Sequence, residues 1–361
     1  MRCDLTKLRA EERIAAELSC LYTDRGYKEY KMSAFEEYST YMDNKDFLIS
    51  QNIVTFSGMD GRLMALRPDV TLSVVKNTKA TYGRTEKLFY NEKVYRPERG
   101  SKTFKEVSQI GVEVIGDVDK TTEAEVVVLI LKTLAAVGQN YVLDLSHMGY
   151  INALLDDFAL NAEQKNALFG YLKEKNVHDF LKYAEEIGLD NKKRDIFKSV
   201  TKLDGSPLHA LAKAEKLSVN AEMRKAVKEL KALVSVLEKL GYADRVNIDF
   251  SIANAADYYN GITFSGYVEG VPKAVLSGGR YDKLAEKFGK KADAIGFALY
   301  LGEACAFLKE SIDKTDVLLI YNDDNVAAAL LRAEELSAAG KSVKLAKSCE
   351  NEDFKEAEYV K

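Results

Sequence analysis

The segments Tyr95-Arg-Pro-Glu-Arg99 and Gln109-Ile-Gly-Val-Glu113 decide the fold and the site of this chain. Both lie where the pattern predicts β-strands, yet both carry polar groups that a strand core does not need. Gln109 and Glu113 are four residues apart, so on one strand their side chains face the same way. On a sheet floor, Arg96 can hold a phosphate, and an amide beside a carboxylate can bind an ammonium group or an imidazole N–H. Taken alone, a solvated face of charged strand residues remains the favoured alternative.

A second polar stretch is Asp257-Tyr-Tyr-Asn-Gly261, which is followed by Ser277-Gly-Gly-Arg-Tyr-Asp282. Tyrosines next to glycines can form a close-fitting pocket that offers hydroxyl donors. A hairpin turn at Asn260-Gly261 with packed aromatic rings explains the same residues. The residues alone leave both interpretations open.

The composition is typical of a globular protein and not of a dedicated nucleic-acid binder. Of the 361 residues, 47% are hydrophobic and 30% are charged, and the net charge is -4. This length predicts about two or three domains. No long basic run occurs, whereas nucleic-acid binders usually show a basic excess or stripe. The sequence therefore does not favour tRNA binding.

The sequence carries no signal for a membrane span, a secretory leader or a metal site. No apolar run reaches the roughly 18 residues that a membrane helix needs, and the first residues lack the apolar core of a signal peptide. Four scattered cysteines without a CxxC pair indicate reduced thiols. Because the three histidines form no cluster with cysteine, we expect no metal. We expect a cytoplasmic protein without a cofactor.

The order of the predicted elements indicates an α+β protein with three regions. Residues 1–149 with 246–310 carry most strands, residues 150–245 show helical periodicity as an insertion, and residues 311–361 contain a short βαβ unit. The predicted strands cover residues 53–56, 62–66, 87–95, 109–115, 141–145, 246–250, 262–264 and 271–276, and a strand runs into a helix over 294–309. The other predicted helices cover residues 7–22 and 121–136, and one opens at Pro68-Asp69. The predicted βαβ unit covers residues 317–320, 325–338 and 342–346.

Six motifs resemble those of histidyl-tRNA synthetases and come in the order of that family. The resemblance covers residues 7–310, and the helical block interrupts it where the family carries an insertion. It implies the class II aminoacyl-tRNA synthetase fold, a mixed and largely antiparallel sheet flanked by helices, usually in a dimer. The motifs are Leu66-Arg-Pro-Asp-Val-Thr71, Tyr95-Arg-Pro-Glu-Arg99, Gln109-x-Gly-x-Glu-x-x-Gly116, Asp257-Tyr-Tyr-Asn-Gly261, Gly278-Gly-Arg-Tyr-Asp282 and Gly296-Phe-Ala298.

The resemblance implies a largely retained histidine pocket. The seven residues that it places there are Asp69, Thr71, Arg96, Gln109, Glu113, Tyr258 and Tyr259. Asp69, where the synthetases have glutamate, would hold amino-acid backbone groups with Thr71 and Gln109. The imidazole side would be lined by Glu113 and the two tyrosines. A carboxylate suits an imidazole N–H, because an analogue without that donor leaves a buried acceptor unpaired, at a cost of about 1–3 kcal/mol.

The same resemblance implies that amino-acid activation is lost at three places. Asn254 stands where the synthetases keep an arginine against the carboxylate and α-phosphate. Glu303 stands where their third motif has a phosphate-binding arginine. The loop over residues 100–105 is shorter and lacks the family's Gly-Arg-x-Arg pattern. Activation builds charge on phosphate and relies on fixed positive charge, so we expect no synthetase activity.

A synthetase-like chain without activation chemistry is similar to the regulatory subunits of short-form ATP phosphoribosyltransferase. Leu143-Asp-Leu-Ser-His-Met-Gly149 resembles their Asp-x-Gly-His-x-Gly segment. For His147, a satisfied and partly buried histidine after a strand explains the residue equally well. The unit at 311–361 is similar to half of an anticodon-binding domain, which implies impaired tRNA recognition.

The resemblance also implies a ligand and partners. The chain would bind L-histidine for feedback inhibition and activate a separate short catalytic subunit, which joins ATP to phosphoribosyl pyrophosphate in the first step of histidine biosynthesis. It would form a homodimer through the class II interface. One alternative is a divergent histidyl-tRNA synthetase-like or amino-acid adenylating enzyme, which would show histidine-dependent pyrophosphate exchange. Another is a binding module, such as a stress sensor or a tRNA-binding paralogue, whose tRNA complex would survive physiological salt.

Overall fold

The computed structural model describes residues 8–44, 52–98, 103–252, 258–307, 315–349 and 354–360. The chain divides into two compact units, one of Met1–Arg9 with Lys309–Lys361 and the other of Ala10–Leu308. In the described ranges, no helix has both the length and the apolar character that a membrane crossing requires.

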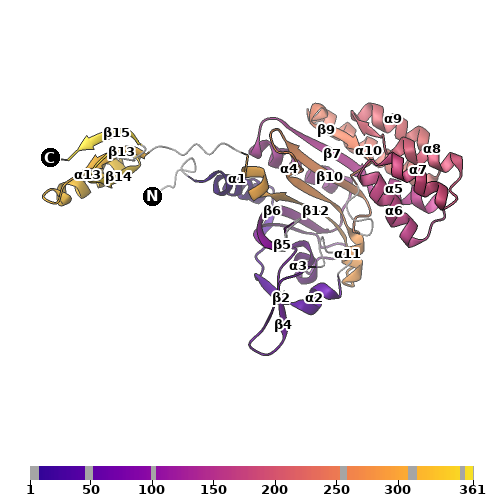
Figure 1. Ribbon diagram of the computed structural model, residues 1–361, viewed down its shortest axis with the longest axis horizontal. Helices are drawn as coiled ribbons and strands as arrows, with labels where there is room; N and C mark the ends of the chain where they lie inside the picture. The colour runs from indigo at the N-terminus through magenta and orange to yellow at the C-terminus, as the bar shows by residue number, and fades with distance from the viewer. Residues whose placement is uncertain are drawn as a thin grey trace. The chain divides into compact units, whose positions relative to one another are not determined.

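The larger unit is built on a nine-stranded sheet with the order β1-β5-β6-β12-β11-β10-β7-β9-β8 (Figure 1). Among the strands described, β1 with β5 and β7 with β9 pair in parallel, and the other neighbours pair antiparallel. This is the mixed, largely antiparallel sheet that the resemblance to histidyl-tRNA synthetases implies. The strands are β1 (Lys28–Glu29), β5 (Glu86–Pro97), β6 (Phe104–Gly116), β7 (Tyr141–His147), β8 (Asp204–Gly205), β9 (Val246–Asp249), β10 (Ile262–Val268), β11 (Leu276–Arg280) and β12 (Asp293–Tyr300).

Helices α1 (Ala10–Asp24) and α4 (Lys120–Val137) pack on one face of this sheet. Buried residues lie around most of α4, as expected for a helix enclosed on several sides. Tyr22 of α1 packs against Phe89 and Phe297 of the sheet, with ring centroids 5.9 and 6.2 Å apart. Its hydroxyl lies 2.8 Å from Thr133 Oγ1 of α4. This apolar layer leaves the opposite face of the sheet for polar side chains.

Within the larger unit, a smaller three-stranded sheet with the order β2-β4-β3 projects away from the nine-stranded sheet and leads into α3 (Figure 1). The hairpin predicted between residues 53–56 and 62–66 is confirmed, because β3 and β4 pair antiparallel. The elements of this region are β2 (Phe35–Glu37), α2 (Tyr38–Met42), β3 (Thr55–Ser57), β4 (Leu63–Leu66) and α3 (Thr71–Asn77).

Six helices follow β7 and gather beside the sheet (Figure 1). They are α5 (Met148–Asp157), α6 (Ala162–Lys173), α7 (Val177–Glu186), α8 (Asn191–Val200), α9 (Pro207–Leu217) and α10 (Ala221–Lys239), and a 3-10 turn η3 (Ala243–Arg245) follows them. Asparagine or aspartate side chains accept a backbone hydrogen bond at the start of α6, α7, α8 and α10. The domain boundaries at residues 150 and 245 stay a prediction, because these helices share one compact unit with the sheet.

The strand predicted at residues 271–276 is misplaced. The structure begins β11 at Leu276 and continues it through Gly278 and Gly279 to Arg280. Glycine usually weakens a strand, but here the close packing excludes a side chain. A Cβ on Gly278 would lie 2.5 Å from Phe264 Cε2 and 2.7 Å from Phe297 Cα. Helix α11 (Asp282–Lys287) follows, and β12 runs directly into α12 (Leu301–Cys305), as predicted for residues 294–309.

The smaller unit contains the predicted βαβ element and one strand more. Its sheet has the order β14-β13-β15, and both pairings are parallel. The elements are β13 (Thr315–Ile320), α13 (Val326–Ala338), β14 (Val343–Ala346) and β15 (Phe354–Tyr359). The sequence prediction misses β15, because its mostly exposed positions carry charged residues and lack the apolar alternation of a half-buried strand.

Candidate functional site

The polar face of the central sheet is assembled by strand register. Residues that pair directly across neighbouring strands share a face. One row across the sheet contains Glu113, Gly296, Gly279, Thr263 and Ser146. The next row contains Tyr90, Gly111, Ala298, Ser277 and Ser265. Gln109 pairs with Tyr300 in the row beyond. The predicted alternation of β6 therefore places Gln109 and Glu113 on one floor.

A cavity of about 440 Å³ lies over this floor. Its volume is within the range of small-molecule sites, about 300–1,000 Å³. All seven residues that the resemblance places in one pocket line it: Asp69, Thr71, Arg96, Gln109, Glu113, Tyr258 and Tyr259. They come from the start of α3, from β5 and β6, and from the segment before β10. The fold thus brings together residues that lie far apart in the sequence.

Glu113 is the most constrained acid of the cavity. Its side chain is buried, and it accepts hydrogen bonds from Thr71 Oγ1, at 2.7 Å from its Oε1, and from the Tyr281 hydroxyl at its Oε2. Burial raises the pKa of Glu113 to about 8, although these two hydrogen bonds lower it in part. In the empty cavity the carboxyl group is therefore largely protonated at neutral pH. A ligand that supplies a hydrogen-bond donor or a positive charge would favour the ionised form.

Two glycines leave the space that the Glu113 carboxyl group and the Tyr259 ring occupy. Gly296 is the β12 partner of Glu113, and a Cβ on Gly296 would clash with Glu113 Oε2. A Cβ on Gly279 would lie 2.6 Å from Cδ1 of Tyr259. Both side chains therefore lie across backbone that only glycine leaves free.

The substitution Gly296→Ala is expected to displace Glu113 and to lower the free energy of unfolding by about 1–3 kcal/mol, because overpacking strains a buried site. Urea denaturation measures the free energy of unfolding, and calorimetric titration with L-histidine measures ligand binding in the cavity. Gly170→Ala on α6 is the matched control, because a Cβ there meets nothing within 4 Å. Equal stability and equal ligand binding in both variants would contradict the assignment.

Asp69 and Arg96 form a charged pair in the cavity. Arg96 Nη2 lies 3.6 Å from Asp69 Oδ2, and Arg96 Nε donates to the Pro68 carbonyl at 2.8 Å. Burial raises the pKa of Asp69, while the Arg96 charge lowers it in part. The Leu72 N–H donates to Asp69 Oδ1 at 3.0 Å. The predicted opening of this helix at Pro68-Asp69 is therefore early, since Asp69 accepts from the first turn of a helix that begins at Thr71.

Three tyrosine rings close the side of the cavity next to Glu113. The ring centroids of Tyr258 and Tyr259 are 4.6 Å apart, and those of Tyr258 and Tyr281 are 5.7 Å apart. Asn260 leads into β10 and is held by Asp282, whose backbone N–H donates to Asn260 Oδ1 at 2.9 Å. The described part of this segment thus lines the cavity, and the alternative of a hairpin turn at Asn260-Gly261 stays a prediction, because residues 253–257 lie outside the described residues.

Several more residues line the same cavity and are absent from the sequence prediction. Tyr281 lies in the quoted Gly278–Asp282 motif, where the neighbouring glycines are the available signal. Tyr300 pairs with Gln109, and its hydroxyl lies 2.8 Å from Ser277 Oγ. Lys173, at the end of α6, lines the cavity from the helical block. No local pattern identifies Lys173, because its place depends on how the helices pack.

Two residues that the sequence singles out, Glu303 and His147, are not among the described residues that line the cavity. Asn254 and the loop residues 99–102 lie outside the described residues. Glu303 of α12 forms ion pairs with Lys105 and Lys273, at 3.3 and 2.7 Å. His147 accepts from the Gly149 N–H at 3.1 Å, and its Nε2 lies 2.9 Å from Glu229 Oε2. His147 therefore caps α5 and binds α10, as a satisfied, buried histidine does.

Comparison with known proteins places the chain in a family. The family model for histidyl-tRNA synthetase matches residues 4–304. An ATP phosphoribosyltransferase regulatory subunit of Clostridium kluyveri is 30% identical over 335 residues, which is 89% of this chain and 85% of that protein. A Bacillus halodurans structure described as an ATP phosphoribosyltransferase regulatory subunit/histidyl-tRNA synthetase has a TM-score of 0.84 at 24% identity and covers 100% of this chain and 96% of that one. A chain of the Thermotoga maritima ATP phosphoribosyl transferase complex shares the fold, with a TM-score of 0.63 at 18% identity over 80% of this chain and 96% of that one. The chain therefore belongs to the histidyl-tRNA synthetase family and, within it, to the ATP phosphoribosyltransferase regulatory subunits.

Proposed function

We propose that this chain binds L-histidine in the cavity over the sheet and passes that occupancy to a separate ATP phosphoribosyltransferase catalytic subunit. The observation that carries the proposal is the pair of buried acids, Glu113 and Asp69, beside the Arg96 cation in one cavity. An amino acid with a basic side chain offers two hydrogen-bond donor groups for the two acids and one carboxylate for the arginine. Feedback then requires a cavity whose histidine affinity differs between two states of the complex.

Each group of L-histidine has a chemically suited residue in the cavity. The imidazole N–H would donate to Glu113, whose oxygens are already oriented by Thr71 and Tyr281. The ammonium group would lie near Asp69 and the Gln109 amide, and the carboxylate near Arg96. In the described part of the chain, the Gln109 side chain makes no hydrogen bond, so it is available to a ligand. A charge-assisted hydrogen bond contributes about 1.5–3 kcal/mol, which favours charged ligands of this shape.

We propose further that the chain has no amino-acid activation chemistry of its own. At Glu303 an anion lies between two lysines, where activation would need free positive charge near the phosphates. The competing function is a divergent histidyl-tRNA synthetase-like or amino-acid adenylating enzyme, which the Arg96 cation in the cavity favours. Histidine-dependent exchange of pyrophosphate into ATP separates the two. We expect no exchange with histidine and ATP at saturation, and exchange would favour the enzyme.

The proposed function is tested by reconstitution with the short catalytic subunit from the same source. Product formation from ATP and phosphoribosyl pyrophosphate is followed while this chain is titrated in, with and without L-histidine. We expect activity that depends on this chain and decreases with histidine. A folded sample on which the activity does not depend would contradict the regulatory role. Activity that depends on the chain but does not change with histidine would contradict the proposal that L-histidine is the regulatory ligand. We place this function in the cytoplasm, in line with the scattered cysteines and the mixed charge.

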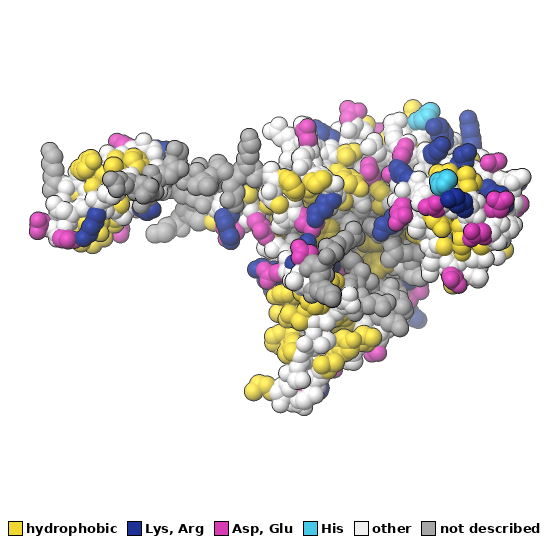
Figure 2. All heavy atoms as spheres, viewed as in Figure 1, with side chains coloured by type: hydrophobic (Ala, Val, Ile, Leu, Met, Phe, Trp, Pro, Cys, Tyr) yellow, Lys and Arg dark blue, Asp and Glu magenta, His cyan; other side chains and the backbone are white. Residues whose placement is uncertain are grey.

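We propose that a second copy of the chain covers the small β2-β4-β3 sheet. Large apolar side chains are exposed there, with Phe35 at 49%, Phe56 at 40% and Leu63 at 47%. The Phe35 and Phe56 rings are 5.7 Å apart at an angle of 87°. Hydrophobic side chains gather over this hairpin (Figure 2). Exposed apolar patches of this kind mark interaction surfaces, and a homodimer would bury this one.

The substitution Phe56→Glu is expected to weaken the homodimer, because a charge would have to be buried in an apolar interface. Light scattering over a dilution series measures the oligomeric state. Leu208→Glu on α9 is the matched control, since Leu208 is 84% exposed on another element. A wild-type monomer, or a Phe56→Glu variant as dimeric as the control, would contradict this interface.

A further inference from the structure

The segment Tyr258–Gly261 forms a wall with a cavity on each side. Tyr258 and Tyr259 line the cavity over the sheet, whereas the next two residues line a second cavity of about 440 Å³, which we call the rear cavity. Side chains next to a void lack packing partners on that side. Apolar packing therefore fixes this wall only in part, and polar contacts are needed to hold it.

The end of strand β11 runs along the same wall. Gly279 lies in the row of Glu113 on the cavity face of the sheet, so the next side chain, that of Arg280, points to the opposite face. Tyr281 again lines the cavity over the sheet, and Arg280 lines the rear cavity. The Asn260 N–H donates to the Arg280 carbonyl at 3.0 Å. The two segments of the wall are thus joined at Asn260 and Arg280.

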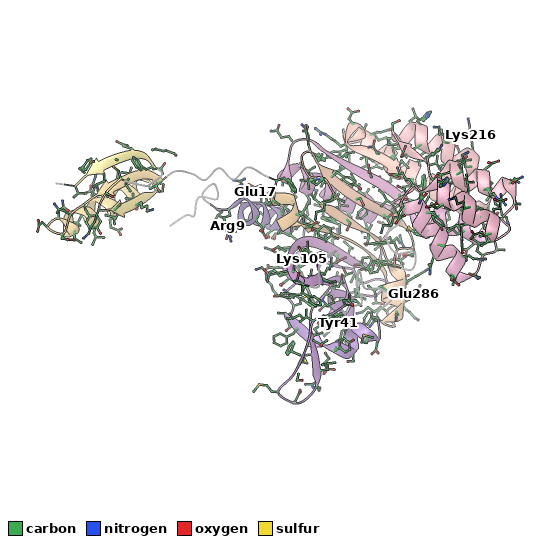
Figure 3. All side chains as sticks on the ribbon, in the orientation of Figure 1. Arg9, Glu17, Tyr41, Lys105, Lys216 and Glu286 are labelled. Atoms are coloured by element: carbon green, nitrogen blue, oxygen red, sulfur yellow. The ribbon has the colours of Figure 1, made fainter. Side chains whose placement is uncertain are left out.

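The Arg280 guanidinium binds three carboxylates from three elements. Its Nη1 lies 2.9 Å from Glu123 Oε1 of α4, its Nη2 lies 2.9 Å from Asp293 Oδ2 of β12, and its Nε lies 2.9 Å from Asp282 Oδ2 at the start of α11. Figure 3 marks α11 by its labelled residue Glu286. The Arg280 side chain is 21% exposed. Only a planar guanidinium presents donors in the directions of all three carboxylates, because an ammonium group is a single point charge.

Asp282 connects this guanidinium to the wall. The oxygen that accepts from Arg280 Nε also accepts from Asn260 Nδ2 at 2.9 Å, and the Asp282 N–H donates to Asn260 Oδ1 at 2.9 Å. Asn260 directly follows Tyr259, and Asp282 directly follows Tyr281. We call these three residues, Arg280, Asp282 and Asn260, the clamp. The places of two rings that line the cavity over the sheet depend on it.

We propose that Arg280 is a positioning residue for L-histidine in the cavity over the sheet: through Asp282 and Asn260 it holds the tyrosine rings of the wall in place. Arg280 is not among the described residues that line that cavity, so it acts through its neighbours. Rings that are already fixed lose little freedom when a ligand binds, which raises the affinity. The inference deepens the proposed function and rests on it for the identity of the ligand.

Calorimetric titration of the full chain with L-histidine compares the wild type with Arg280→Lys, which keeps the charge but loses the planar fork. We expect the affinity to fall by about tenfold, because the rings must then be ordered on binding. Arg194→Lys is the matched control, since Arg194 Nε donates to the Leu189 carbonyl at 2.6 Å in the helical block and lines neither cavity. Its affinity should equal that of the wild type. Equal affinity in the wild type and Arg280→Lys would overturn the proposal.

The Tyr259→Phe background separates positioning from a general loss of stability. Arg280→Lys should weaken binding by a smaller factor in this background than in the wild type, because both changes act on the same ring. An equal loss in the two backgrounds would show that Arg280 acts elsewhere and overturn the proposal. If Arg280→Lys does not fold, Asn260→Ser breaks the clamp from its other end and is expected to give the same result in both backgrounds.

Hydrogen exchange in the ligand-free chain tests the clamp apart from the proposed function. The N–H groups of Asn260 and Asp282 are hydrogen-bonded within the clamp, so they should exchange faster in Arg280→Lys than in the wild type, while β6 keeps its exchange rates. Unchanged exchange at both residues would show that Arg280 does not hold the wall. A wild type that does not bind L-histidine contradicts the proposed function, whereas the exchange comparison still decides the clamp.

Discussion

Glu113→Gln is expected to weaken L-histidine binding by about one to two orders of magnitude while the chain stays folded. The amide keeps the shape of the side chain but loses the charge that an imidazole N–H or imidazolium would meet. Replacing a charge-assisted hydrogen bond by a neutral one removes part of about 1.5–3 kcal/mol, and each 1.4 kcal/mol is a factor of ten. The two neighbouring hydroxyls, of Thr71 and Tyr281, can rotate to suit the amide. Calorimetric titration with L-histidine measures the change.

The matched control lies on the same strand. Glu106→Gln changes the same type of side chain on β6, but Glu106 is 44% exposed and pairs with Lys93 at 2.6 Å on the surface. Its L-histidine affinity should equal that of the wild type. Tyr259→Phe, which removes a hydroxyl from the cavity lining, is expected to weaken binding by a smaller factor. If neither Glu113→Gln nor Tyr259→Phe changes the affinity, the ligand binds elsewhere.

The empty protein is expected to lose stability as the pH rises from about 5 to about 8. Burial raises the pKa of Glu113 from 4.5 to about 8 in the folded chain. An acid with a raised folded-state pKa contributes stability that is full below the unfolded pKa and is lost as the pH rises to the folded pKa. At 1.36 kcal/mol for each pKa unit, this separation corresponds to a loss of about 4–5 kcal/mol.

Urea denaturation followed by circular dichroism, at several pH values without L-histidine, measures this dependence. As the pH rises, the unfolding free energy of the wild type should fall relative to that of Glu113→Gln, because glutamine does not titrate. The Glu106→Gln control should follow the wild-type curve. Parallel curves for the wild type and Glu113→Gln between pH 5 and 8 would show that Glu113 ionises normally in the folded chain.

Most strands and helices follow from local patterns in the sequence, whereas the class II fold and the seven pocket residues follow from the resemblance to histidyl-tRNA synthetases. Alternation along one strand puts Gln109 and Glu113 on the same face, and β6 confirms it. The helical periodicity of residues 150–245 appears as α5–α10, of which α6, α7, α8 and α10 begin at an asparagine or aspartate cap. The sequence predicts instead that the strand at residues 271–276 ends at Leu276, before the glycine-rich Gly278–Asp282 stretch. Its strand state depends on Phe264 and Phe297, which belong to the two neighbouring strands.

Tertiary structure alone decided the electrostatics of the site. Thr71 and Tyr281 hold the Glu113 carboxyl group from 42 and 168 residues away along the chain. Lys105 neutralises Glu303 across 198 residues. The sequence by itself determined which side chains each strand presents, because backbone geometry alternates them over a few neighbouring residues. Which of those side chains are buried, paired or left for a ligand depends on strand order, since that order brings distant segments into contact and removes their water.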